Sequence, residues 1–326
     1  MTNTSYKRIR AERDIVFHKA DRRGQSKFEA KEQLKKDAIE NGTPVPQVRG
    51  MFSISTFDDY MKRSNQFIRY VNGLGVDVKH LSDLRQYVVP YLKDGETRWS
   101  AWTSTKQGHA LATLFECQAK DFEYDFPKRE RQNIKRTRSE PESVGNRYTE
   151  GEAYRERREF LRATGMRRIE VLRIRKEDII ENGDGTMALS LLGKGGKRRT
   201  APVMPGKEAM VRAVLQQFID CPPNREKGFI PANWIPDHMA THCYRAQYAM
   251  DFYNLYLSQG RGIGKSGDTH TIYYCRKDKA GQWYYKNILL MVSRNMGHNR
   301  EEVVVSNYFY SGWQPCIPFG SAPTQK

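Results

Sequence analysis

The sequence predicts a mainly helical α+β protein with two small β-hairpins, organised as two domains. Apolar residues recur at helical spacing in many segments, and two pairs of short alternating stretches flank glycine-bearing turns. A charged stretch from 125 to 147, punctuated by two prolines, separates two parts that each carry apolar residues. The length of 326 residues also exceeds what one hydrophobic core usually supports.

The N-terminal part is expected to comprise a basic arm and a helical domain. Residues 1–50 are polar and rich in Lys and Arg, with a helix-compatible stretch at 27–40, and are interpreted as a basic arm. Residues 51–124 are interpreted as a small helical domain. Its helices are expected at 53–73, with Ser and Thr capping candidates, then from Ser82 with Pro90 limiting or kinking it, and at about 99–122.

The C-terminal part, residues 148–326, is expected to mix helices with two hairpins. Residues 125–147 are interpreted as an exposed basic linker. Two strands, 186–192 and 199–203, are joined by GKGGK, and a second hairpin is expected between 260 and 286. Helical spacing predicts helices at 148–164, 168–174, 206–220, 238–258, 286–296 and 300–307.

Composition narrows the function classes. The chain has 55 Lys and Arg against 38 Asp and Glu, a net charge of +17 that would attract a polyanion, so nucleic acid is the leading partner. No long apolar stretch or signal-peptide segment is evident, so we expect a cytoplasmic protein without a membrane partner. The five scattered cysteines contain no CxxC pair, and neither phosphate-loop nor GxGxxG motifs occur. We therefore expect no metal and no cofactor, with chemistry supplied by side chains.

The first of four segments suited to phosphate chemistry is TGMR at 164–167, where a glycine turn delivers Arg167 to a helix start. Arginine offers a planar fork of donors that matches two phosphate oxygens. The second is GKGGK at 193–197, which places Lys194 at a hairpin tip, where a lysine could protonate a leaving oxygen. Each has a simpler interpretation, as a solvated surface arginine and as a glycine-rich turn with solubilising charge.

The third segment, HCYR, places His242 and Arg245 three positions apart, so both project from one face of a helix and could contact one anion. A histidine facing a core is more often structural than catalytic. The fourth segment begins with Gly297 and His298 and continues through a short apolar stretch to Tyr308, with Tyr310 close behind.

The order of these segments resembles the catalytic domain of the tyrosine recombinase (phage-type integrase) family, in particular its mobile-element integrases. The match covers about 148–310, and 51–124 agrees in size and place with the core-binding domain of that family. Residues 1–50 would correspond to an arm-type DNA-binding region. The site residues implied by the resemblance are Arg167, Lys194, His242, Arg245, His298 and the nucleophile Tyr308, with Glu170 in support.

The resemblance implies that Tyr308 attacks a phosphodiester, forms a 3'-phosphotyrosyl bond and releases a 5'-hydroxyl, without ATP or metal. Arg167 and Arg245 would stabilise the extra negative charge of the transition state, and His298 would donate a further hydrogen bond. Lys194 would protonate the leaving 5'-oxygen, and His242 would assist proton transfer or bind phosphate. Glu170 would orient its neighbours.

Two assignments stay open. Tyr308 is preferred over Tyr310 because it follows His298 by ten positions, and Lys194 is preferred over Lys197 because of the GKG match. The stretch from 260 to 286 separates HCYR from His298 further than in compact members of the family.

The implied partner is double-stranded DNA at an attachment or crossover site, bound by a tetramer, with accessory DNA-bending factors as further candidates. The DNA contacts expected in the linker and hairpin are Lys128, Arg129, Arg131, Lys135, Arg136, Arg138, Lys197 and Arg198. A type IB topoisomerase would share this chemistry, and a non-catalytic DNA-binding protein of the same fold would share the charge. Motif spacing and the filled candidate positions favour the recombinase, and the expected basic arm favours integration of a mobile element.

Overall fold

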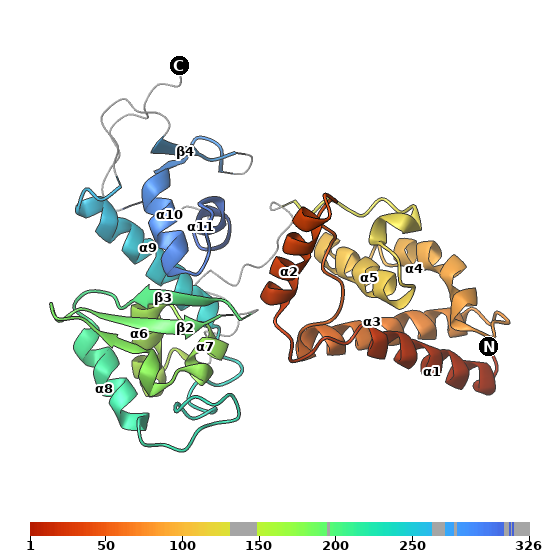
Figure 1. Cartoon of the computed structure of the whole chain (residues 1–326), viewed down its shortest axis with the longest axis horizontal. Helices are drawn as coiled ribbons and strands as arrows, with labels where there is room; N and C mark the ends of the chain where they lie inside the picture. Colours follow the sequence, from red (N-terminus) through yellow and green to blue (C-terminus); the bar gives the residue numbers. More distant parts are fainter. Residues whose placement is uncertain are drawn as a thin grey trace. The chain divides into compact units, whose positions relative to one another are not determined.

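The computed structural model describes residues 1–130, 149–193, 196–262, 271–276, 279–309, 313 and 315. The chain divides into two compact units, Met1–Asn133 and Ile134–Lys326 (Figure 1). The first unit has one hydrophobic core, and the second has two adjoining buried clusters. Within the described residues, no helix combines the length and the apolar character needed to cross a membrane.

The first unit is helical. Its helices are α1 (Asn3–Lys19), α2 (Lys27–Glu40), α3 (Ile54–Gly73), α4 (Val88–Asp94) and α5 (Ala101–Leu114), with 3-10 turns at Leu81–Tyr87 and Ala119–Phe122. A Ser or Thr residue caps the N-terminus of each of the four longest helices of this unit. Its hydroxyl group accepts a hydrogen bond from the backbone N–H three residues later. These bonds measure 3.1 to 3.3 Å and are accepted by Thr2, Ser26, Ser53 and Ser100.

Two helices of this unit are shorter than the sequence predicted, because the backbone changes direction within the predicted ranges. The segment after Ser82 starts as a 3-10 turn, and α4 then begins at Val88, so that Pro90 lies in its first turn, where no intrahelical N–H is needed. The helix expected at about 99–122 ends at Leu114, since Glu116 adopts a left-handed conformation with φ of 51°.

Helix α1 was not predicted, and it belongs to the first unit's core. Ile9 and Phe17 are fully buried in the same cluster as Phe67 of α3, and the buried guanidinium of Arg13, between them, donates to Asn65. The region expected to form a separate arm therefore contributes one packed helix. The sequence signal was weak because a charged residue occupies the buried position between two apolar ones. A role in DNA binding for residues 1–50 stays a prediction.

The second unit confirms the predicted mixture of helices and hairpins. Its helices are α6 (Arg155–Thr164), α7 (Arg168–Arg173), α8 (Glu208–Phe218), α9 (Thr241–Ser258), α10 (Lys286–Asn295) and α11 (Glu302–Asn307). Strands β1 (Ile179–Glu181), β2 (Met187–Leu192) and β3 (Arg198–Pro202) form an antiparallel sheet in that order, and β4 (Ile272–Tyr274) pairs with β5 (Trp283–Tyr285). Strand β1 was not predicted.

Helix α9 links the two buried clusters of this unit. Cys243 and Tyr244 pack with the sheet, α6 and α8, whereas the residues from Ala246 to Leu257 pack with α10, α11 and the β4–β5 hairpin. Figure 1 shows α9 running from the three-stranded sheet toward α10 and α11. A side chain near the start of α9 is therefore held between two packed regions, and Arg245 occupies that position.

The packing of α1 predicts that Phe17→Ala lowers the stability of the first unit by about 3 to 5 kcal/mol, because a fully buried aromatic ring is replaced by a cavity. Ile15→Ala, on the same helix but 60% exposed, is the control and should change stability by less than about 0.5 kcal/mol. Hydrogen exchange of the slowest amides of α3 measures both. Equal effects of the two variants would contradict the assignment of α1 to the core.

Candidate active site

A glycine turn carries the chain from α6 into α7 and places two side chains of the candidate site. Gly165 ends α6 in the left-handed region with φ of 57°, and a Cβ there would lie 2.5 Å from the ring of Tyr248. Glycine is required at this position for both reasons. Two residues later Arg167 precedes α7, and its backbone N–H donates to Glu170 Oε2 at 2.7 Å.

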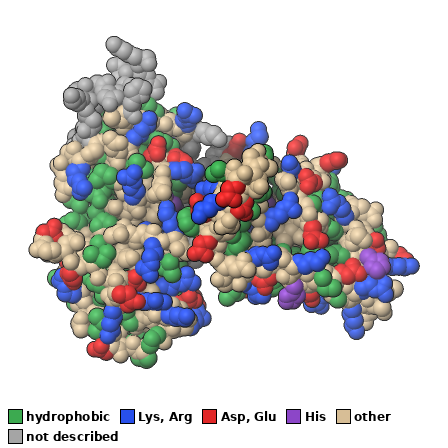
Figure 2. Space-filling model, viewed as in Figure 1, with side chains coloured by type: hydrophobic (Ala, Val, Ile, Leu, Met, Phe, Trp, Pro, Cys, Tyr) green, Lys and Arg blue, Asp and Glu red, His purple; other side chains and the backbone are tan. Residues whose placement is uncertain are grey.

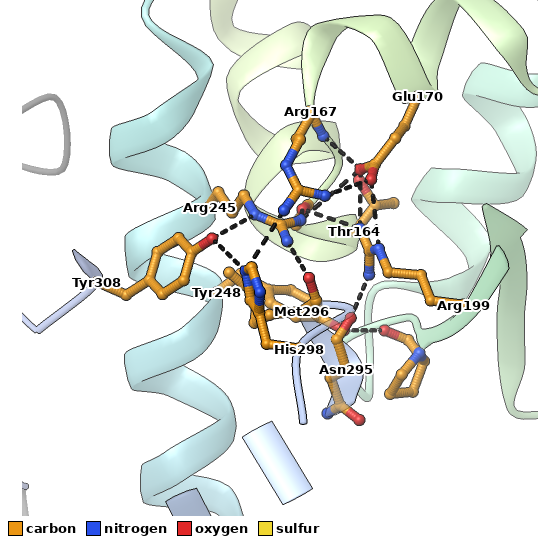
Figure 3. Close-up of polar contacts among 12 residues, drawn as sticks. Thr164, Arg167, Glu170, Arg199, Arg245, Tyr248, Asn295, Met296, His298 and Tyr308 are labelled. Carbon is orange, nitrogen blue, oxygen red and sulfur yellow. Dashed lines mark hydrogen bonds and ion pairs between the residues drawn. The ribbon is translucent and has the colours of Figure 1, made fainter. Parts of the chain in front are cut away.

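Glu170 is fully buried and lies at the centre of an arginine cluster (Figure 3). Its carboxylate pairs with Arg167 Nη1 at 2.7 Å, with Arg199 Nη2 at 2.9 Å and with Arg245 Nη1 at 3.7 Å. Burial alone would raise the pKa of this carboxyl. The charges of Arg199, Arg245 and Arg167, with a hydrogen bond from Arg199, outweigh burial and lower the pKa of Glu170 from 4.5 to about 2. The carboxylate is therefore ionised at neutral pH.

Arg245 is buried, and each of its three side-chain nitrogens donates a hydrogen bond. Its side chain is 1% exposed, two of its nitrogens donate to the carbonyls of Gly165 and Met296, and Nε donates to the Tyr308 hydroxyl at 3.3 Å. Burial lowers the pKa of Arg245 to about 10, which leaves the guanidinium charged at neutral pH. A cation fixed in this way can stabilise developing negative charge without first reorganising.

The Tyr308 hydroxyl lies between Arg245 and His298. His298 follows Gly297, whose φ of 78° turns the chain after α10, and its Nε2 is 3.2 Å from the Tyr308 hydroxyl and 3.5 Å from Arg167 Nη2. Burial and the charges of Arg167 and Arg245 lower the pKa of His298 to about 4. The imidazole is therefore neutral near pH 7.

Tyr308 comes directly after α11, a helix of only six residues. The side chain is 5% exposed, and its backbone N–H donates to Val304 O at 3.0 Å. Figure 3 shows the phenol pointing toward Arg245 and His298. Five of the residues predicted from the sequence thus meet at one site: Arg167, Glu170, Arg245, His298 and Tyr308.

Lys197, the hairpin lysine that falls within the described residues, lies close to this site. Lys197 is among the charges that lower the pKa of His298, and its Nζ is 3.3 Å from Asn299 when the amide oxygen of Asn299 faces it. Lys194 and Tyr310 lie outside the described residues, so both alternatives from the sequence stay open. His242 is half-buried on α9, one turn before Arg245, and its catalytic role stays a prediction.

Only some of the residues that were expected to contact DNA fall within the described residues. Lys128 and Arg129 are exposed, whereas Arg131, Lys135, Arg136 and Arg138 lie outside the described residues. Arg198 is half-exposed and pairs with Asp178 at 2.7 Å. On the face shown in Figure 2, Lys and Arg side chains are spread over both units with acidic side chains among them.

Sequence reasoning missed Arg199. This arginine is buried on β3, donates to the carbonyl of Asn295 as well as to Glu170, and so connects the sheet to the end of α10. A signal was present, because Arg199, Ala201 and Val203 alternate along one face of the strand and all three are buried. An arginine at an inward-facing strand position requires a buried anion.

Comparison with family models and with curated proteins finds no match. Among solved structures, the site-specific recombinase XerH in a post-cleavage complex with palindromic difH substrate is similar to this chain, with a TM-score of 0.53 and 14% identity over 95% of this chain and 94% of that one. The pre-cleavage complex of XerH with difH gives a TM-score of 0.50, also at 14% identity, over 96% of this chain and 95% of that one.

The chain has the tyrosine-recombinase fold. The fold class predicted from the sequence is therefore confirmed, and so is the resemblance at the level of fold. Among the described residues, no group of three or more His, Cys, Asp or Glu side chains is placed to hold a metal ion.

The lowered pKa of Glu170 gives a prediction for acid stability. A carboxylate whose pKa is lowered on folding stabilises the protein above pH 4.5, and this contribution is lost as the pH falls from about 4.5 toward 2. We expect Glu170→Gln to be less stable than the wild type above pH 4.5 by about 3 to 5 kcal/mol, because the buried arginines lose their counter-charge. The difference should shrink on acidification.

Urea unfolding of the second unit at several pH values measures this effect. Glu177→Gln, whose side chain is 67% exposed, is the matched control and should follow the wild-type pH dependence. A stability gap between Glu170→Gln and the wild type that is constant from pH 6 to pH 3 would contradict the prediction.

Proposed function

We propose that this protein is a site-specific DNA recombinase that cuts and rejoins DNA through a 3'-phosphotyrosyl bond to Tyr308. One observation carries the proposal: the Tyr308 hydroxyl is 3.3 Å from the buried guanidinium of Arg245 and 3.2 Å from a neutral His298, next to Arg167. A tyrosine that only packs in a core needs one hydrogen-bond partner. Here an arginine and an imidazole both contact the hydroxyl, and Arg167 lies beside that imidazole, an arrangement suited to attack on a phosphodiester.

The geometry supports a direct route for the proton of the nucleophile. Arg245 Nε donates to the Tyr308 oxygen, which leaves the hydroxyl proton free to point at His298 Nε2. A neutral imidazole with its proton on Nδ1 can accept that proton as the phenolate oxygen bonds to phosphorus, because the negative charge of the bound phosphate offsets the arginine charges that lower the pKa of His298 in the free protein. His298 therefore takes the role of proton acceptor, in place of the hydrogen-bond donor implied by the resemblance. Arg167 and Arg245 balance the charge that develops on the phosphoryl oxygens.

The leaving 5'-oxygen needs a proton when its bond to phosphorus breaks, and the hairpin between β2 and β3 supplies the candidate acids. Lys194 is the proposed donor, with Lys197 as the alternative because it lies beside Asn299 and lowers the pKa of His298. Rejoining reverses the sequence, with the 5'-hydroxyl attacking the phosphotyrosyl bond, so no external energy source is required.

Duplex DNA is the proposed partner, for which XerH provides the precedent because its structures are complexes with difH substrate. The net charge of +17 favours a polyanion. The first unit also contains a cleft of about 620 Å³ whose lining includes the cations Lys19, Arg22, Arg49 and Lys120. These side chains are suited to contact phosphates of the bound duplex.

We further propose that four protomers act on two duplexes, since exchange of both strands of each duplex needs four nucleophiles. The protein would act in the cytoplasm, associated with the nucleoid when bound to DNA, and would integrate or excise a mobile element, with DNA-bending proteins as accessory factors. A type IB topoisomerase shares the same tyrosine chemistry, and relaxation of a plasmid that carries no selected site would favour that alternative.

Covalent trapping tests the proposed function. The wild type, incubated with a pool of randomised nicked duplexes, should form a protease-sensitive adduct that survives denaturation, because the nicked strand diffuses away before it can be rejoined. Tyr308→Phe should abolish the adduct and retain DNA binding, whereas Tyr310→Phe should retain the adduct. An adduct that persists in Tyr308→Phe and is lost in Tyr310→Phe would move the nucleophile. Absence of any wild-type adduct would favour a non-catalytic DNA-binding protein.

The acid is tested with a substrate whose leaving 5'-oxygen is replaced by sulfur. A thiolate leaves without a proton, so loss of the general acid matters less on this substrate. Lys194→Ala should slow adduct formation about 10²- to 10⁴-fold on the oxygen substrate and much less on the sulfur one. Lys197→Ala is the matched control. Selective rescue of Lys197→Ala would assign the acid to Lys197, and equal slowing of Lys194→Ala on both substrates would contradict its proposed role.

A further inference from the structure

One buried cation lies outside the arginine cluster and next to the proposed nucleophile. Lys279 is 7% exposed, and among the described residues it is the lysine that the fold buries. It belongs to the segment between β4 and β5, within the stretch that makes HCYR and His298 unusually distant in sequence. The site described above does not use it.

The ammonium of Lys279 binds the chain on both sides of Tyr308. Its Nζ donates to Val305 O at 3.0 Å and to the carbonyl of Phe309. The first carbonyl lies in the last turn of α11, and the second belongs to the residue that follows the tyrosine. Carbonyls at the end of a helix lack partners within the helix, and a cation there is favoured by the helix dipole.

The backbone leaves helical geometry at Tyr308, which explains why this point needs support. Tyr308 has φ of −124° and ψ of −34°, and the N–H groups of Tyr308 and Phe309 both donate to Val304 O, at 3.0 and 3.1 Å. A six-residue helix has too few internal hydrogen bonds to hold its own end. The position of the phenol therefore depends on contacts from elsewhere in the fold.

The hairpin supplies apolar as well as polar contacts to this end. Tyr284 of β5 packs on Phe309 with ring centroids 5.1 Å apart, and Tyr253 of α9 packs on the same ring at 5.4 Å. The turn that carries Lys279 is itself held by backbone bonds, from Cys275 N to Gln282 O at 2.9 Å and from Gln282 N to Lys279 O at 3.1 Å. The ammonium thus extends from a braced segment.

We propose that Lys279 is a positioning residue that fixes the end of α11 and so sets where the Tyr308 hydroxyl lies. The effect of Lys279 on catalysis rests on the proposed function, whereas its effect on the position of the backbone does not. Charge-assisted hydrogen bonds to two carbonyls that bracket the nucleophile restrain the backbone on both sides of it. The β4–β5 hairpin acts through this contact as a brace for the nucleophile within the same chain.

The first test needs no DNA. In the full-length free protein, Lys279→Met removes the donors and keeps an unbranched apolar side chain, so the amides of Tyr308 and Phe309 should exchange at least about tenfold faster, as expected when a local opening becomes easier. Amides of α6 should keep their rates. Lys279→Gln, which keeps a shorter donor, should fall between. Arg276→Met removes an exposed cation from the same hairpin and is the control, with wild-type exchange throughout.

The second test separates positioning from binding. With nicked duplexes selected by the wild type, Lys279→Met should form the covalent adduct about 10²-fold more slowly in a single turnover, as expected for a misplaced reacting group, while the affinity for DNA changes less than about twofold. Arg276→Met should keep the wild-type ratio of adduct rate to affinity.

Different outcomes of the two tests would contradict different parts of the proposal. Unchanged exchange at Tyr308 and Phe309 in Lys279→Met would overturn the positioning role, as would faster exchange spread evenly over the second unit. A wild-type adduct rate in Lys279→Met would overturn its catalytic consequence. Absence of an adduct with the wild type would overturn the proposed function itself, whatever the exchange data show.

Discussion

The second unit depends on one buried carboxylate. Glu170 pairs with Arg167, Arg199 and Arg245, which come from the start of α7, from β3 and from α9. Three guanidinium groups that share one carboxylate would repel one another if that carboxylate were absent, most strongly where they are buried. Their charges in turn keep the carboxyl ionised, with a pKa of about 2 against the opposing effect of burial. The pairing converts an unfavourable set of buried charges into a rigid frame for the site.

The frame holds two kinds of arginine with different roles. Arg199 bonds to Glu170 and to the backbone carbonyls of Gly165 and Asn295, and joins the sheet to the end of α10. Arg245 also binds carbonyls but keeps Nε for the Tyr308 hydroxyl, and Arg167 is 23% exposed and faces His298. Arg199 therefore braces the cluster, while Arg245 contacts the Tyr308 hydroxyl and Arg167 is partly exposed beside His298. Burial and the same cluster lower the pKa of His298 to about 4, because a further positive charge is disfavoured beside the arginines.

The backbone that carries Tyr308, the proposed nucleophile, is supported by other contacts. Helix α11 is short, and Tyr308 lies beyond its end, so neither helix propensity nor the arginine cluster fixes the backbone at this point. Lys279 and Tyr284, both from the β4–β5 hairpin, contact the chain on either side of the tyrosine. From the sequence, the stretch between α9 and α10 looked only like an unusually long connection. In the structure it supports the backbone on either side of Tyr308.

The sequence by itself determined the fold class, most helices, both hairpins and the order of the site residues, because helical and strand periodicity, caps and glycine turns are local properties. It also brought out Arg167, Glu170, Arg245, His298 and Tyr308, since each lies in a short motif of recognisable chemistry. Tertiary structure alone decided that α1 joins the core through Ile9 and Phe17, that Arg199 completes the charge balance and that Lys279 binds the backbone on either side of Tyr308. These three depend on contacts between residues far apart in the chain, and the burial of a charged side chain depends on a partner that no local pattern reveals.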